Sequence, residues 1–105
     1  MSSPKQALGP REVIVRIVQG ADGKPEARPP RFHVSKGMQQ VVVWECPVDF
    51  AVVFNESPFY ESQFDQSCDC SGLVRRGVLP NQDKPYKYSI YAWGQVTDPD
   101  GIVDR

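Results

Sequence analysis

Three cysteines are the residues of this sequence best suited to metal or redox chemistry. Cys68 and Cys70 are separated by one residue, so both side chains point to the same side if the segment is extended. Thiolates are soft ligands that favour Cu(I) or zinc, but zinc normally takes four ligands. An odd number of cysteines does not indicate a disulfide framework. We expect reduced thiols, with Cys46 a small buried side chain; the alternative is a metal-binding or redox role for Cys46, Cys68 and Cys70.

The other reactive side chains do not form a catalytic pattern. The single histidine, His33, has no serine or cysteine at a motif spacing that could serve as its nucleophile. The Asp-Pro-Asp-Gly stretch at 98–101 has the composition of a turn, which explains its carboxylates without a cation site. No GxGxxG, P-loop or HExxH motif occurs. We therefore predict that the protein is not an enzyme and uses no cofactor.

The composition indicates one all-β domain. A length of 105 residues is typical of a single domain. Val and Ile together number 18 against 3 Leu, and β-branched residues favour strands over helices. The 10 prolines leave little room for long helices. We expect residues 1–11 to be a flexible lead-in and residues 12–105 to form the domain.

The charge balance and the short apolar runs limit the possible partners. There are 12 Lys and Arg against 13 Asp and Glu, so the composition does not indicate a nucleic-acid-binding face. The longest uninterrupted apolar runs, Val41–Trp44 and Phe50–Phe54, are too short to span a bilayer, and the N-terminus lacks a signal-peptide pattern. We expect a cytoplasmic protein that binds another protein or itself, although a secreted protein whose signal has been removed would look the same.

Short alternating runs predict seven or eight strands, with loops over 19–30 and 77–85. The clearest strand candidates are 12–18, 31–34, 39–46, 50–55, 72–76, 86–93 and 102–103. Ser57 and Pro58 have the types of an N-cap and a first helical residue, which predicts one short helix over 58–66. The alternate positions of the best strands predict these core residues: Val15, Ile17, Val42, Trp44, Val52, Phe54, Tyr88 and Ile90.

The order of these strands resembles the cupredoxins, the small blue-copper β-sandwiches. The stretches FHVSKG at 32–37 and VVVW at 41–44 look like the family's second strand, glycine turn and third strand. FAVVF at 50–54 looks like the fourth strand, and 86–90 and 101–103 look like the last two. The resemblance covers roughly residues 31–54 and 86–104, and it implies a Greek-key β-sandwich.

The positions that match the family's copper ligands carry residues that do not bind copper. Phe50 and Trp93 stand where the resemblance implies histidines, and Ile90 stands where it implies the cysteine. A blue-copper centre requires a thiolate and two imidazoles around one metal. The resemblance therefore implies the fold without copper and without electron transfer.

The aromatic residues near these positions point to binding. Phe50, Tyr91 and Trp93 either fill the former metal site as an apolar plug or expose an apolar surface. Tyr and Trp often anchor protein interfaces, and Arg75 and Arg76 would supply charge at the rim. We therefore predict a non-catalytic, copper-free binding module that contacts a protein partner or a second copy of itself, and neither nucleic acid nor a membrane.

Overall fold

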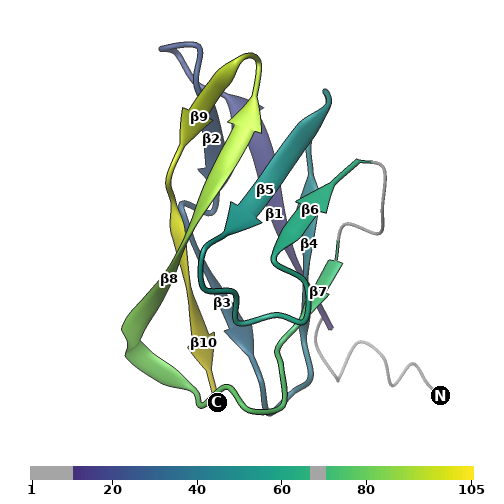
Figure 1. Cartoon of the computed structure of the whole chain (residues 1–105), viewed down its shortest axis with the longest axis vertical. Helices are drawn as coiled ribbons and strands as arrows, with labels where there is room; N and C mark the ends of the chain where they lie inside the picture. The colour runs from purple at the N-terminus through teal and green to yellow at the C-terminus, as the bar shows by residue number, and fades with distance from the viewer. Residues whose placement is uncertain (1–10, 67–70) are drawn as a thin grey trace, which may run out of the picture.

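The structure is a computed structural model that describes residues 11–66 and 71–105. It confirms the predicted all-β class (Figure 1). These described residues contain no helix. Their strands, in chain order, are β1 (Glu12–Gln19), β2 (Pro25–Arg28), β3 (Arg31–Ser35), β4 (Val41–Glu45), β5 (Phe50–Phe54), β6 (Gln63–Asp65), β7 (Ser71–Leu73), β8 (Asn81–Ala92), β9 (Gln95–Thr97) and β10 (Asp100–Asp104).

The first sheet has the strand order β2-β1-β4-β7 and is mixed. β1 lies parallel to β4 and antiparallel to β2, and β7 lies antiparallel to β4. The alternation predicted from the sequence is present, because Val15 and Ile17 of β1 and Val42 and Trp44 of β4 are buried. Their neighbours along each strand point to the opposite face of the sheet.

The second sheet has the order β3-β10-β8-β5-β6, and β9 also pairs with β8. β3 lies parallel to β10, whereas the other pairs are antiparallel. β8, with 12 residues, runs along most of the length of the molecule (Figure 1). Its first half pairs with β10 and its second half pairs with β5 and β9. β8 therefore connects the two ends of the protein.

One aromatic core joins the two sheets. Trp44 of the first sheet lies against four aromatic rings of the second sheet and its connections, with ring centroids between 5.0 and 6.1 Å apart: Phe32, Phe54, Phe64 and Tyr88. All eight core residues predicted from the alternation are buried. This part of the sequence prediction is confirmed.

The helix predicted over 58–66 is wrong. Gln63–Asp65 forms β6 against β5, and Phe59 forms an isolated β-bridge with Val74. Phe59 and Phe64 are almost fully buried, at 1% and 0% exposure, and their rings contact each other. An extended chain with a turn places both rings in the core, so their burial does not require a helix.

Ser57 organises a turn at the position where the sequence predicted a helix cap. Its hydroxyl accepts a hydrogen bond from the backbone N–H of Phe59 and donates one to the carbonyl of Glu61. Serine side chains make such local bonds in turns as readily as at helix caps. The hydroxyl therefore marks a chain reversal but does not determine the secondary structure of the next residues.

Two predicted loops contain strand residues. β2 lies inside the expected loop over 19–30, and β8 begins at Asn81, inside the expected loop over 77–85. Pro85 is tolerated within β8 because, among the described residues, no strand pairs with this half of β8 on the side of β5. Proline identifies an edge here, not the end of a strand.

The chain reverses at Trp93-Gly94 and not at the predicted turn over 98–101. Ala92 pairs with Gln95, so Trp93 and Gly94 form a two-residue hairpin loop, with φ angles of 53° and 69°. Positive φ at both positions is typical of a type I′ turn, which fits the twist of a hairpin. Asp98 and Pro99 interrupt the returning strand between β9 and β10 without reversing it.

Candidate functional site

A row of outward-facing side chains crosses four strands next to this hairpin. Ala51 of β5 pairs with Asp65 of β6 on one side and with Tyr91 of β8 on the other, and Tyr91 pairs with Val96 of β9. Tyr91 and Val96 are 49% and 45% exposed. Because Ala51 has only a methyl side chain, the sheet surface is recessed where it stands between larger neighbours.

This recess opens into a hollow with a volume of about 670 Å³, which we call the hairpin hollow. Phe50 is buried at 7% exposure and therefore contributes to its floor. The backbone N–H of Phe50 donates a 2.9 Å hydrogen bond to the side-chain carbonyl of Gln66, which fixes one wall. The lining residues are Asp49, Phe50, Ala51, Gln66, Tyr91, Ala92, Trp93, Gly94, Gln95 and Val96.

Trp93 is held in an unusual conformation at the edge of the hairpin hollow. A left-handed backbone costs a non-glycine residue about 1–2 kcal/mol, and type I′ turns favour Asn or Asp followed by Gly. The indole is partly buried and packs against the core, which offsets some of this cost. Strained backbone of this kind is found more often at functional sites than elsewhere.

The hairpin hollow is lined mainly by apolar groups and carries negative charge at its rim. Its lining contains no Lys or Arg, and the exposed carboxylate of Asp49 lies at its edge. The arrangement can receive an apolar or aromatic side chain, and it favours a cationic group over an anionic one next to that side chain.

The structure brings together three of the five residues predicted to bind a partner. Phe50, Tyr91 and Trp93 all line the hairpin hollow. Arg75 and Arg76 do not, because they lie beyond β7 near the opposite end of β8. The guanidinium of Arg75 donates to the carbonyl of Ser57, and the carbonyl of Arg76 accepts from Lys36 Nζ. Arg75 and Arg76 therefore do not lie at the rim of this hollow.

The positions compared with copper ligands are apolar in three dimensions as well. Ile90 is fully buried, and Phe50 is nearly so. Among residues 11–66 and 71–105, no cluster of three or more His, Cys, Asp or Glu side chains could hold a metal ion.

Of the cysteines, Cys46 lies within the described part of the chain, whereas Cys68 and Cys70 lie outside it. Cys46 is partly buried against the core. Burial raises the pKa of its thiol, and a backbone hydrogen bond at Val48 offsets part of the shift. A raised pKa reduces the thiolate fraction at neutral pH, and the thiolate is the form that attacks disulfides and binds metals.

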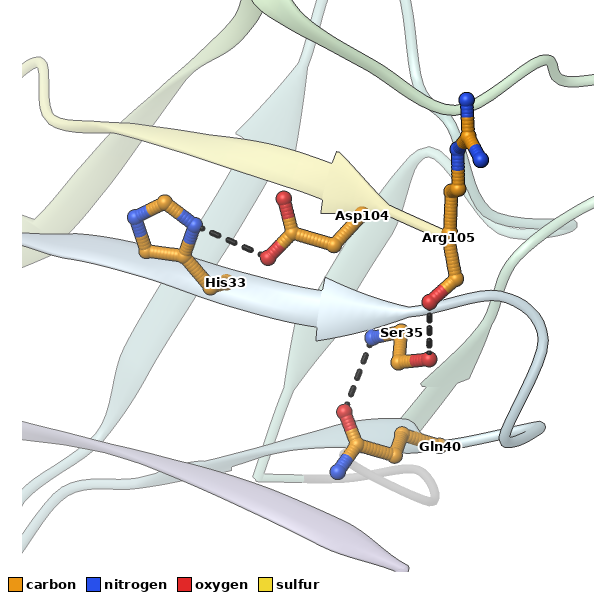
Figure 2. A network of polar contacts seen from close by, with 5 residues as sticks. All are labelled: His33, Ser35, Gln40, Asp104 and Arg105. Carbon is orange, nitrogen blue, oxygen red and sulfur yellow. Dashed lines mark hydrogen bonds and ion pairs between the residues drawn. The ribbon is translucent and has the colours of Figure 1, made fainter.

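His33 takes part in a polar network at the edge of the second sheet (Figure 2). Its Nδ1 lies 3.0 Å from Asp104 Oδ2, across the parallel pair of β3 and β10. The hydroxyl of Ser35 donates to the carbonyl of Arg105, and the backbone N–H of Ser35 donates to Gln40 Oε1. These bonds connect the ends of β3 and β10. Because the hydroxyl of Ser35 donates to Arg105, Ser35 and His33 do not form a nucleophile–histidine pair.

Sequence reasoning missed Ala51 and Val96. The alternation along 50–54 already placed Ala51 on the outward face, but a small outward residue becomes a recess only when its cross-strand neighbours are known. Val96 lies outside all of the predicted strands, so the sequence did not place it opposite Tyr91.

Comparisons with known proteins leave the function to be inferred from this geometry. No protein-family model, no curated protein and no solved structure matches the chain. Within the described residues, no helix is long and apolar enough to cross a membrane.

Proposed function

We propose that this protein is a non-catalytic binding module that uses the hairpin hollow to hold an apolar side chain of a protein partner. We further propose that its scaffold is a Greek-key β-sandwich of the cupredoxin type in which the copper site has become this hollow. The single observation that carries the function is the exposed pair of Tyr91 and Val96 beside the recess at Ala51.

The size and chemistry of the hairpin hollow support this role. Its volume of about 670 Å³ lies within the range of ligand sites, roughly 300–1,000 Å³. Tyr and Trp provide large contact areas and lose little conformational entropy on binding, which makes them frequent anchors of interfaces. Gln66 and Gln95 offer amide groups at the edge that can bond the backbone of a bound segment.

The scaffold proposal is supported by how the resembling stretches fold. Residues 32–34, 41–44, 50–54, 86–90 and 101–103 all belong to strands, and Phe50 and Trp93, at two matched ligand positions, line the same hollow. Phe50 and Ile90 fill the interior below it. A scaffold whose metal positions hold apolar groups can retain its shape and bind through that surface, because function depends on the site and not on the fold.

A peptide selection combined with NMR mapping tests the proposed function. The immobilised protein is screened against a random-peptide display library, and an enriched peptide is titrated into isotope-labelled protein. We expect the largest amide shift changes at residues 49–51 and 91–96. A peptide that shifts mainly residues on the first sheet, or a library that yields no enriched peptide, would count against the hairpin hollow as a binding site.

A further inference from the structure

A second exposed apolar surface lies at the opposite end of the molecule from the hairpin hollow. Met38, Leu73 and Leu79 are 52%, 42% and 79% exposed, and Tyr60 is 62% exposed. Tyr60 and Leu73 line a common depression with Lys36 and Arg76. The segment between β7 and β8 lies at the bottom of Figure 1, whereas the β8–β9 hairpin lies at the top.

Three cations, Lys36, Arg75 and Arg76, outnumber the one carboxylate next to Tyr60 in the chain, that of Glu61. Lys36 Nζ donates to the carbonyls of Arg76 and Val78, and Leu79 is the next residue along the chain. Arg75 donates to a carbonyl, that of Ser57. Within the described residues, no carboxylate forms an ion pair with Lys36, Arg75 or Arg76. We call this surface the basic patch, and it comprises Lys36, Met38, Tyr60, Leu73, Arg75, Arg76 and Leu79.

The two ends of the molecule are complementary. The hairpin hollow is an apolar recess with the carboxylate of Asp49 at its rim. The basic patch is a set of exposed apolar side chains with cations beside them. We propose that the hairpin hollow of one molecule binds the basic patch of a second copy of the same chain. This inference rests on the proposed function and names its partner.

The dimensions of the protein allow such a contact. Its principal extents are 45, 32 and 24 Å, so an end measures about 32 by 24 Å. A stable interface of standard size buries about 800 Å² on each partner, which is comparable to one end of the molecule. Because the contact joins two different surfaces, it does not close with two molecules but continues into chains or rings.

A mixture of two variants tests the head-to-tail contact. Tyr91→Asp alters the hairpin hollow and leaves the basic patch intact; the double variant Leu79→Asp with Arg76→Glu does the reverse. We expect the wild type to form species larger than two chains in sedimentation velocity as the concentration increases, and each variant alone to remain a single chain. An equimolar mixture should then form a two-chain complex, since one intact hollow meets one intact patch.

The alternatives give different results. A symmetric contact between two hollows, or between two patches, would let one of the variants dimerise alone and would overturn the proposal. A wild type that stays monomeric at all concentrations would overturn it as well, as would assembly that does not weaken at high salt, since opposite charges are screened there. Binding of the selected peptide to the Leu79→Asp, Arg76→Glu variant reports on the hollow separately, so loss of self-association and failure of the hollow as a binding site are distinguishable.

Discussion

Gly101 is the residue whose side-chain size matters most for the packing of the second sheet. A Cβ atom at this position would lie 2.1 to 2.3 Å from three ring carbons of Phe32, which stands opposite it in register. Gly101→Ala should therefore lower the free energy of unfolding by about 3 kcal/mol, at the upper end of typical overpacking costs. The measurement is urea denaturation.

Gly77→Ala is the matched control for this change. Nothing lies within 4 Å of a Cβ atom built at Gly77, so the same substitution should change stability by less than about 0.5 kcal/mol. Equal effects of the two substitutions would show that Phe32 does not cover Gly101.

The ion pair between Arg31 and Asp100 makes stability depend on pH. Arg31 donates two hydrogen bonds to the Asp100 carboxylate, at 2.7 and 2.9 Å, and these bonds lower the pKa of that carboxyl group. Because the pKa is lower in the folded state, the carboxylate stabilises the protein above the unfolded-state value of about 4. This contribution is lost as the pH falls through the lower pKa of the folded state.

Asp100→Asn should thus be less stable than the wild type at pH 7, and the difference should shrink below about pH 4. Urea denaturation of both proteins between pH 2.5 and 7 measures this difference in the free energy of unfolding. The other titrating groups are the same in both proteins, so their contributions cancel. A difference that stays constant or grows in acid would contradict the assignment.

The thiol of Cys46 should be a slow nucleophile. In the Cys68→Ser, Cys70→Ser variant it is the sole remaining thiol, so its reaction with a disulfide reagent can be followed alone. Because burial raises the pKa of the Cys46 thiol, the reaction rate should reach half its maximum above the usual pH of about 8.5. Rapid reaction at pH 7 would favour the alternative redox or metal-binding role for the cysteines.

At the scale of elements, the first half of β8 is an exposed strand edge that its sequence protects. Lys84, Pro85 and Lys87 lie in this half, and proline has no N–H to offer to another strand. Natural proteins protect edges with lysine and proline in this way. Replacing the three residues with Val, Thr and Val should cause concentration-dependent aggregation, measured by light scattering.

A variant that loses two cations away from this edge, Arg11→Val with Lys24→Val, is the control for that experiment. It should scatter no more light than the wild type under the same conditions. Aggregation of both variants would assign the effect to net charge and not to the edge of β8.

A strand could be predicted from the sequence when its own residues specify it, and not when pairing with a distant strand determines it. β1, β4, β5 and the second half of β8 are clear runs of strand-forming residues, so alternate positions along them predicted the buried faces. β2 and β9 are short and rich in polar residues, and pairing with β1 and β8 determines them. The helix prediction failed because Phe59 packs against Phe32 and Phe64 packs against Trp44, and both partners are distant in the sequence.

The same distinction applies to the candidate site. Tyr91 and Trp93 could be identified from the sequence because Tyr and Trp near a strand end often anchor protein interfaces. The recess at Ala51 depends on three strand pairings that no local pattern specifies. The separation of Arg75 and Arg76 from the hollow could not be predicted, because the alternation of β7 and β8 does not specify the path of the chain between them.

At the scale of the whole molecule, the protein has two dissimilar ends connected by β8. Figure 1 shows the β8–β9 hairpin at one end and the segment between β7 and β8 at the other. The hairpin hollow with Asp49 is lined by residues of the first, and the basic patch includes Arg76 of the second. The net charge of −1 conceals this separation, since it sums the two ends. An uneven distribution of a nearly balanced charge steers partners and fixes their orientation more than it adds affinity.

The most direct test of the central claim is the affinity of a library-selected peptide for two variants with matched changes. Tyr91→Asp places a carboxylate at the hairpin hollow, and Ile14→Asp places one on the outward face of the first sheet, where Ile14 is 37% exposed. By isothermal titration calorimetry we expect at least about tenfold weaker binding to Tyr91→Asp, corresponding to about 1.4 kcal/mol, and binding to Ile14→Asp within about twofold of the wild type. Equal affinity for the Tyr91→Asp variant and the wild type would contradict the assignment of the hairpin hollow as the binding site.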